Sequence, residues 1–567
     1  MDLLERHFDT AFDAPDGIKK LRELILTLAM QGKLVPQDPN DPPACELLKE
    51  IEREKQLLVK KGKLKISTVL SPVTELEETF TLPGSWTWVR LGSVAQHNSG
   101  KTLDGGRNSG TSRDYITTSN LYWGRFELDN VRQMLIRDEE LERCTARKSD
   151  LLVCEGGEAG RAAVWELESE VCFQNHIHRL RFYGKISPYY GFRFFEYLNV
   201  SGDIEKYRKG VGISNMSSKA LASIPFPLPP VAEQLRILKR INELMARCDA
   251  LEKLRAERDA KRLAVHTAAV RQLLNVADTD GHTQAREFLG QHFGELYTVK
   301  ENVTELRKAI LQLAVMGKLV PQDPNDRPAS ELLNQIEAEK KRLVKEGKLR
   351  EPKPSIPVSD EQVPYLLPKA WKWVRVSDIV DVGTGSTPSK TNRDYYGGAI
   401  PWYTSAATNR PIANEPETFI TEDALKETNC KVFPAGSLII ALYGQGKTRG
   451  QISELPVAGA TNQAIAAMVF YESSLPIKKY LKNFFLKIYE EIRLIAEGAA
   501  QPNLNVGKVK DTLVPLPPLR EQHCIVTKID QLMSLCDTLE QQIDAAGATQ
   551  SAMLNAMMAQ YGGQRCA

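Results

Sequence analysis

The sequence has almost no net charge and no long apolar run, and each of these absences excludes a class of protein. Lysine and arginine together number 74 and aspartate and glutamate 72, so no global field marks a binder of polyanions. No run of about 18 apolar residues could span a bilayer. The acidic start, MDLLERHFDTAFDAPDG, lacks the pattern of a signal peptide. A cytoplasmic protein without membrane contact is predicted, and any site for nucleic acid must be local.

Cysteine usage excludes two further classes. The nine cysteines are odd in number and contain no Cys-x-x-Cys pair, which fits neither a disulfide framework nor a zinc site. We therefore expect reduced thiols. With 567 residues, 42% hydrophobic and 26% charged, the chain has the composition of a folded protein of about three to four domains.

The chain contains an internal duplication. Residues 21–65 match residues 306–350 without a gap, and 31 of these 45 positions are identical. At the same offset, LPGSWTWVRLGSVAQ (82–96) recurs as LPKAWKWVRVSDIVD (367–381). PLPPVAEQLRILKRI (227–241) recurs as PLPPLREQHCIVTKI (515–529). Each copy thus holds a variable insert, about 97–224 and 382–512, between two constant segments.

The constant segments are predicted to be helical. A helical pair is expected at about 17–31 and 44–61, joined by a loop rich in Gly and Pro. After Pro-Leu-Pro-Pro, apolar residues step by four and three, the spacing of a coiled-coil seam. The predicted spacer-helix seam consists of Ile237, Ile241, Leu244, Leu251, Ile525, Ile529, Leu532 and Leu539, with Cys248 and Cys536 at equivalent positions. A helix over about 231–275 would act as a spacer; an ordinary amphipathic helix of a bundle is the alternative.

Each insert is predicted to be a mixed α/β domain. Short apolar runs such as 151–153, 171–173 and 438–442 lie between clusters of Gly, Ser, Thr and Asn, as strands lie between loops. One helix is expected in each insert, around 188–200 and 476–496.

Four motifs that suggest catalysis or ligand binding have simpler interpretations. Gly100-Lys101-Thr102 and Gly446-Lys447-Thr448 resemble part of a P-loop but lack the first glycine and a following helix. The Gly-x-Gly after Asp381 resembles a cofactor loop, yet no Asn-Pro-Pro-aromatic element accompanies it.

The other two motifs involve charged and metal-binding residue types. The carboxylates of 337–340, like those of 52–55, are predicted to form a solvated helix face. His176 and His178 are expected to be structural, because a metal site would need more ligands. We therefore predict no catalytic, cofactor or metal site.

The inserts carry polar side chains suited to DNA. Arg, Lys, Asn and Gln can read base edges, and Ser and Thr can bind phosphates, although ordinary surface loops would have the same composition. The candidates in the first insert are Lys101, Arg107, Asn108, Arg113, Asn120, Arg161, Asn175, Arg208, Lys209 and Asn215. Those in the second are Ser386, Thr387, Lys390, Thr391, Asn392, Arg393, Tyr403, Thr404, Ser405, Lys447, Arg449, Asn462, Gln463, Asn503 and Asn505.

The whole layout resembles the specificity subunit of type I restriction-modification systems. The resemblance rests on the ordered set of two Pro-Leu-Pro-Pro-x-x-Glu-Gln segments, two Trp-x-Trp-Val-Arg entries, and the exits Gly-Ile-Ser-Asn215 and Gln-Pro-Asn503-Leu. It implies an α+β fold with two mixed α/β target-recognition domains in a pseudo-twofold repeat, separated by long antiparallel coiled-coil helices.

This resemblance also implies a function. Each recognition domain would read one half of a bipartite, asymmetric double-stranded DNA site, and the helices would fix the gap. The chain itself would be non-catalytic and hold no cofactor. Two modification subunits and two restriction subunits would supply methylation and cleavage, with S-adenosylmethionine, ATP and Mg bound there.

Two other functions remain open from sequence: a duplicated scaffold that binds proteins, and a methyltransferase that acts alone. The scaffold would show no sequence-specific binding of DNA with any combination of subunits, whereas the methyltransferase would bind its cofactor without a partner. The predicted domains are a helical region at 1–81, recognition domains at 82–226 and 367–514, a central helical region at 227–366, and a spacer helix at 515–567.

Overall fold

The protein was analysed as a computed structural model, which describes residues 13–62, 70–104, 108–209, 214–274, 279–351, 357–359, 361–444, 448–492 and 504–561. The chain divides into two compact units. Unit 1 contains residues 1–258 and 545–567, and unit 2 contains residues 259–544. The division falls inside the two longest helices, α9 (Val231–Leu274) and α19 (Leu519–Tyr561).

The helical pair predicted for each copy is present. It consists of α3 (Gly17–Met30) and α4 (Ala44–Lys60) in unit 1, and of α12 (Lys300–Val315) and α13 (Ala329–Lys345) in unit 2. Gly32 and Gly317 follow the first helix of each pair with φ of 68°. A Cβ at either glycine would lie within 2.7 Å of a proline ring, so the loop requires glycine for both conformation and space. Two further helices, α10 (Thr279–Gln291) and α11 (Phe293–Leu296), precede α12.

The insert of unit 1 contains two four-stranded sheets. The first has the order β10-β8-β12-β2, and the second the order β6-β3-β11-β7. The strands are β2 (Ala95–Ser99), β3 (Thr111–Ile116), β6 (Arg132–Ile136), β7 (Thr145–Ala146), β8 (Leu151–Cys154), β10 (Ala162–Val164), β11 (Val171–Phe173) and β12 (Ile177–Phe182). The expected helix is α7 (Pro188–Ser201). Strands β8 and β11 confirm the apolar runs predicted as strands.

The insert of unit 2 repeats this topology despite its different sequence. Its sheets have the orders β21-β20-β23-β16 and β18-β17-β22-β19. The strands are β16 (Val380–Thr384), β17 (Tyr396–Tyr403), β18 (Thr418–Ile420), β19 (Val432–Phe433), β20 (Leu438–Ala441), β21 (Ile452–Glu454), β22 (Gly459–Thr461) and β23 (Ile465–Phe470). In both units the two central strands of the second sheet run parallel to each other, β3 with β11 and β17 with β22. The helix predicted at about 476–496 is α16 (Lys478–Lys487), followed after Ile488 by a helical segment at 489–492, where this part of the described chain ends.

A two-stranded sheet joins the beginning and the end of each insert. Strand β1 (Thr87–Arg90), from the Trp-x-Trp segment, pairs antiparallel with β14 (Pro225–Leu228), and β15 (Lys372–Arg375) pairs in the same way with β24 (Leu513–Leu516). The indole of Trp86 donates a hydrogen bond of 2.9 Å to the buried carboxylate of Glu233, which also accepts one from Gln37. The Pro-Leu-Pro-Pro-x-x-Glu-Gln motif therefore closes the frame around the insert.

The same hydrogen bonds to a buried carboxylate recur in unit 2. The indole of Trp371 donates to Glu521 at 2.8 Å, and Gln322 donates to the other oxygen of that carboxylate. Burial raises the pKa of Glu521, and the hydrogen bonds from Trp371 and Gln322 act in the opposite direction.

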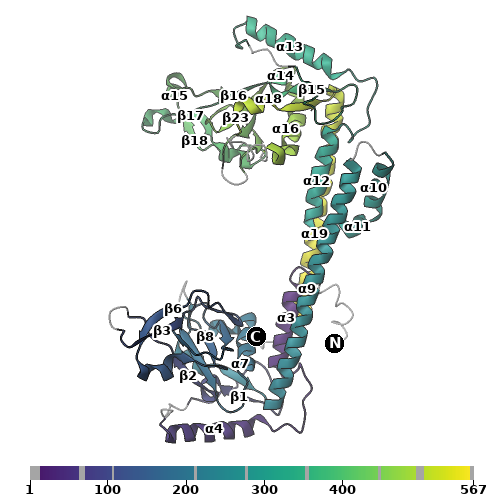
Figure 1. Cartoon of the computed structure of the whole chain (residues 1–567). Helices are drawn as coiled ribbons and strands as arrows, with labels where there is room; N and C mark the ends of the chain where they lie inside the picture. The colour runs from purple at the N-terminus through teal and green to yellow at the C-terminus, as the bar shows by residue number, and fades with distance from the viewer. Residues whose placement is uncertain are drawn as a thin grey trace. The chain divides into compact units, whose positions relative to one another are not determined.

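Helices α9 and α19 begin inside the cores of the two units. Ile237 and Ile241 are buried in one apolar cluster with Ile25 and Ala29 of α3, which lies beside α9 in Figure 1. In unit 2, Ile525 and Ile529 are buried in the cluster that contains Ile310 of α12, with Leu532 and Leu539 partly buried against it. Leu244 is likewise partly buried, whereas Leu251 is 42% exposed.

The first half of each predicted seam thus packs against the frame helix of its own copy. Identical ion pairs reinforce that packing: Arg22 binds Asp249 and Glu252, and Arg307 binds Asp537 and Glu540. The spacing of four and three residues could not distinguish this arrangement from a seam between two spacer helices, since both bury one helix stripe. The α+β class, the two mixed domains and the long helices are confirmed.

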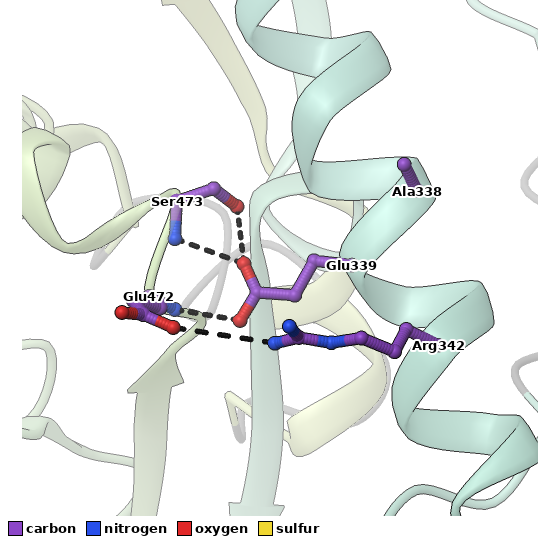
Figure 2. A pocket seen from close by; sticks show the side chains of 5 residues that line it. All are labelled: Ala338, Glu339, Arg342, Glu472 and Ser473. Atoms are coloured by element: carbon purple, nitrogen blue, oxygen red, sulfur yellow. Dashed lines mark hydrogen bonds and ion pairs between the residues drawn. The ribbon is translucent and has the colours of Figure 1, made fainter.

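The prediction of a solvated charged face on α13 holds for Glu337, whose side chain is 65% exposed, but is wrong for Glu339 and Lys340. The carboxylate of Glu339 accepts hydrogen bonds of 2.9 Å from the backbone amides of Glu472 and Ser473, and one from the Ser473 hydroxyl (Figure 2). Lys340 donates to the carbonyls of Ser377 and Asp378. In unit 1, Glu54 accepts from the amide of Gly184, at the equivalent turn. The second frame helix is therefore tied to the turn that follows the last strand of the first sheet.

We expect Glu339→Ala to release α13 from that turn. Three donors lose their charged acceptor, so the cost should be about 1–3 kcal/mol, with faster hydrogen exchange at residues 472–474. Glu337, with a side chain 65% exposed two residues earlier, provides the matched control Glu337→Ala. Equal exchange at 472–474 in both variants would show that the contact does not hold the helix.

Candidate nucleic-acid interface

In unit 1, one end of the first sheet gathers several of the predicted polar residues. There β2 ends, β12 begins, and the turn 174–176 lies between β11 and β12. The amide of Lys101 donates to the carbonyl of Phe173, and the amide of Asn175 donates to the carbonyl of Lys101. Asn215 pairs with Gly156 next to the end of β8, and Lys209 bridges to Asn215. Asn175, Lys209 and Asn215 are thus brought together at one sheet end.

The equivalent end of unit 2 gathers a different set. Thr384 ends β16 and donates to the carbonyl of Ile465, where β23 begins. Thr387 donates to the side chain of Gln463, and the amide of Asn462 donates to the carbonyl of Tyr403 at the end of β17. Thr404 and Ser405 follow directly and are half-buried.

A glycine brings these backbones into contact in both units. A Cβ at Gly100 would lie 2.1 Å from the carbonyl oxygen of Phe173, and one at Gly385 would lie 1.8 Å from that of Thr461. No larger residue fits at either position. Gly100, from a P-loop-like motif, and Gly385, from the cofactor-like motif, are therefore explained by close packing of the chain against the turn, whereas Gly446 lies outside the described residues.

Several other predicted residues are engaged within their own domain. Asn120 is buried and binds the backbone of the 117–130 loop, and the buried Tyr403 ends β17. Lys101 forms an ion pair with Glu140, and Arg161 binds Glu158 and the carbonyl of Thr118. Arg208 donates to the carbonyl of Ala159 and pairs with Glu205. These contacts hold loops in place.

The remaining predicted residues lie on or near the surface. Lys390, Thr391, Arg393 and Asn505 are exposed, while Asn108, Ser386, Asn392 and Arg449 are half-buried; Arg113 pairs with Asp138. Asn392 and Asn505 also cap short helical segments with their side chains. Arg107, Lys447 and Asn503 lie outside the described residues.

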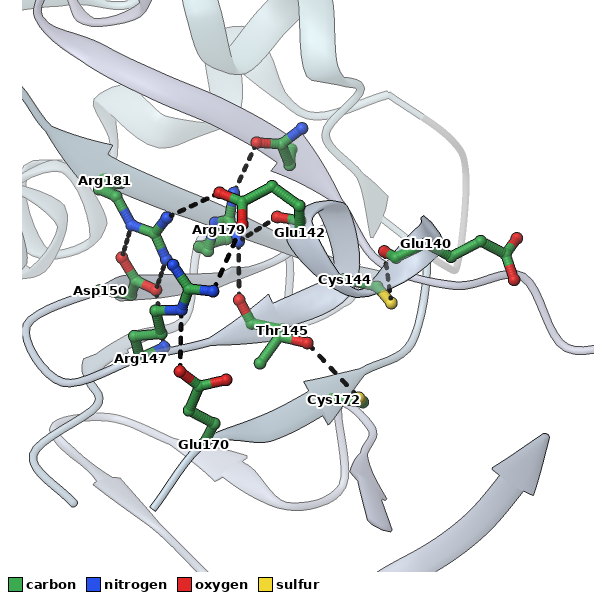
Figure 3. A network of polar contacts seen from close by, with 11 residues as sticks. Glu140, Glu142, Cys144, Thr145, Arg147, Asp150, Glu170, Cys172, Arg179 and Arg181 are labelled. Atoms are coloured by element: carbon green, nitrogen blue, oxygen red, sulfur yellow. Dashed lines mark hydrogen bonds and ion pairs between the residues drawn. The ribbon is translucent and has the colours of Figure 1, made fainter. Parts of the chain in front are cut away.

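A buried arginine that the sequence reasoning missed joins the two sheets of unit 1. Arg179 of β12 is 1% exposed and donates to the carbonyls of Glu142 and Thr145 and to the side chain of Asn98 (Figure 3). Burial lowers the pKa of Arg179 to about 10, so the guanidinium stays charged at neutral pH. Beside it, Arg181 binds both carboxylate oxygens of Asp150 at 2.7 Å. The network fixes the second sheet against the first.

The expected structural role of His178 fits its surroundings. Its ring is fully buried, with Nδ1 3.0 Å from Nε2 of His97 and Nε2 2.8 Å from the carbonyl oxygen of Met216. Burial, and then the neighbouring His178 and Arg179, lower the pKa of His97 to about 3. Burial also lowers the pKa of His178, although Glu155 at 3.8 Å opposes that shift.

The histidine pair should make unit 1 sensitive to acid. Both rings are held neutral in the fold, so the unfolded chain binds more protons once the pH falls below the ordinary histidine value of 6.5. Stability should therefore be complete above about pH 6.5 and decrease progressively towards pH 3. Hydrogen exchange of β2 and β12 as a function of pH measures this loss.

Replacing His97 with Asn should flatten that pH profile, because one buried titrating ring is removed. The exposed His176, in the adjoining turn, supplies the control His176→Asn, which should leave the profile of β2 and β12 unchanged. Identical acid profiles for wild type and His97→Asn would contradict the assignment.

The described residues contain no group of three or more His, Cys, Asp or Glu side chains placed to hold a metal ion. The eight cysteines described are all free thiols. Within the same residues, no helix is both long and apolar enough to cross a membrane.

Comparison with known proteins agrees with the repeated architecture. The profile of the type I restriction modification DNA specificity domain matches this chain twice, at residues 83–258 and 368–546. The chain belongs to the type I restriction-modification specificity family. Each match begins at the Trp-x-Trp entry and extends along the long helix that follows the insert.

Relatives match nearly the whole chain. It is 32% identical to the type I restriction enzyme EcoAI specificity subunit of Escherichia coli, over 95% of this chain and 93% of that protein. It is 31% identical to the EcoEI specificity subunit of the same organism, again over 95% and 93%. A crystal structure of the HsdS subunit from Thermoanaerobacter tengcongensis is 17% identical, covering 84% of this chain and 98% of that one, with a TM-score of 0.41.

Proposed function

We propose that this specificity-family chain reads DNA for a type I restriction-modification complex. Each recognition domain reads one half of a bipartite, asymmetric site in double-stranded DNA. The observation that carries this proposal is the pair of equivalent sheet ends, which share topology and glycine contacts but present different side chains. Asn175, Lys209 and Asn215 lie at one, and Thr387, Asn462 and Gln463 at the other. Two unlike readers in like frames would read two unlike half-sites.

The near-neutral net charge is compatible with this role if phosphate contacts are few and local. Lys209 is exposed at the sheet end of unit 1, and Lys390 and Arg393 are exposed in the segment between β16 and β17, whereas many other basic side chains are paired with acidic ones. Each phosphate contact adds to the salt dependence of binding, so binding by this chain alone should be weak and only modestly salt-dependent. Partner subunits would supply the remaining contacts.

Helices α9 and α19, of 44 and 43 residues, would set the gap between the half-sites. The chain would be non-catalytic. S-Adenosylmethionine, ATP and Mg would be bound by two modification and two restriction subunits. Because its ligand would be the DNA of the cell, we place the protein in the cytoplasm.

The first test is a methylation map of cells that express this chain together with the modification subunit encoded beside it. We expect methylated adenines in a single split motif, and only when both subunits are present. A stable complex that methylates no motif would favour the alternative scaffold. Methylation by this chain alone would show that it is an enzyme.

The repeated frame also supports a partner that binds twice. Ten consecutive residues, Gly32–Asp41 and Gly317–Asp326, are identical in the two copies. Part of this identity has structural causes, such as the hydrogen bond that Gln37 donates to Glu233. However, Pro36, Pro39 and Asn40 are exposed, as are their counterparts, and Asn325 lines a groove of about 560 Å³ with Leu519 and His523. An identical exposed loop in each copy suits two copies of one modification subunit.

This part of the proposal has a stoichiometric test. Asn40→Arg or Asn325→Arg alone should reduce the number of bound modification subunits from two to one, and the double variant should bind none. Native mass spectrometry of the complex measures this number. Gln56→Arg, at an exposed position that differs between the copies, is the control. Full occupancy in the double variant would exclude the loops as docking sites.

A further inference from the structure

The two recognition domains place a carboxamide at the same point of the fold. In unit 1, the turn between β11 and β12 holds Asn175 two residues after the end of β11. In unit 2, the turn between β22 and β23 holds Gln463 two residues after the end of β22. The surrounding sequences are little alike, since Gln-Asn-His stands in one turn and Asn-Gln-Ala in the other, each followed by isoleucine. The strand order establishes the equivalence.

The backbone of the second turn is rigidly held. The amide of Asn462 donates 2.9 Å to the carbonyl of Tyr403, and the Asn462 side chain accepts from the amide of Ala464 at 3.0 Å. The carbonyl of Ala464 accepts from the amide of Leu442. The close approach at Gly385 packs the chain after β16 against the same turn. A side chain carried by this turn therefore projects from a fixed base, as sequence reading requires.

The carboxamide of Gln463 is itself tethered. The hydroxyl of Thr387 donates to its Oε1 at 2.6 Å, although Gln463 as a whole is exposed. This contact occupies one lone pair of Oε1. The second lone pair and the N–H groups of Nε2 have no hydrogen-bond partner among the described residues, so they are available to a ligand. An exposed glutamine would otherwise sample many rotamers, and binding would have to immobilise it.

A carboxamide that presents one acceptor beside one donor matches the major-groove edge of adenine, which offers N6–H and N7. We propose that Gln463 reads an adenine in the second half-site and that Thr387 is the positioning residue for its carboxamide. This inference rests on the proposed function and adds the base and the residue pair. Asn175 would be the corresponding reader in the first domain, where no described hydrogen bond joins it to Thr102, the counterpart of Thr387 in sequence.

The test uses the full complex with its modification subunit and compares methylation motifs of four variants. Thr387→Val keeps the shape but removes the hydroxyl, whereas Thr387→Ser keeps the hydroxyl. Gln463→Ala removes the reader, and Asn175→Ala removes its counterpart. We expect Gln463→Ala and Thr387→Val to lose about five- to one-hundred-fold of the preference for adenine at one position of one half-site. Thr387→Ser should retain the wild-type motif.

The other half-site serves as the internal control for folding, since it should be unchanged in these variants and altered only by Asn175→Ala. Unchanged motifs in Thr387→Val and Gln463→Ala would overturn the inference. So would relaxation at a base other than adenine, or the same relaxation in Thr387→Ser as in Thr387→Val. A wild-type complex that methylates no split motif would instead contradict the proposed function, before any variant is compared.

Discussion

The fold depends on a buried carboxylate that joins three distant segments in each copy. Glu233 receives hydrogen bonds from Trp86, at the entry of the insert, and from Gln37, in the frame loop. The adjacent Gln234 binds the carbonyl of Pro229 and the amide of Ser187. A buried charge is costly unless its lone pairs are used, so each donor is needed for the others to be tolerated. These hydrogen bonds, here called the clasp, join the entry of the insert, the frame loop and the start of α9.

The clasp explains how one frame can carry two different inserts. Entry and exit strands are paired in the same register in both copies, with Trp88 opposite Pro227 and Trp373 opposite Pro515. Between these fixed ends, the same sheet order is built from unlike sequences. Residue type is restricted strongly by the buried apolar core and by close backbone approaches such as those at Gly100 and Gly385. The side chains at the sheet end are otherwise free to differ, as a specificity subunit requires.

The sequence predicted the architecture well because duplication exposes what the frame needs. The helical pairs, the long helices and the strands β8, β11 and β20 followed from periodicity and composition. The role of Glu54 and Glu339 did not, because a charged stripe on an amphipathic helix gives no sign of which carboxylate meets a turn. A comparison of the copies does not identify them either, since the exposed Glu337 has an equivalent in Glu52 just as Glu339 has one in Glu54.

The candidate site was less predictable for a related reason. Asn and Arg suit base reading, but they also suit the internal support of loops, and Asn120 and Arg161 are used for support. Residue type alone cannot separate the two uses. Arg179 was missed because the arginines of β12 form no recognisable motif, and its three hydrogen bonds are to groups far away in sequence.

The position of the seam residues bears on how a spacer helix could control a recognition domain. Ile237 and Ile241 belong to the same apolar core as strands β1 and β14 and helix α7. The start of α9 is therefore part of the domain. Polar substitution there would therefore damage the domain itself before it altered any spacing. A helix packed into the core in this way would transmit its orientation to the proposed DNA-reading surface through packed side chains rather than through a hinge. Ile525 and Ile529 of α19 are buried in the core of unit 2 in the same way, so each domain packs against its own long helix. The proposed fixed gap between the two half-sites would then require only that the helices themselves be rigid.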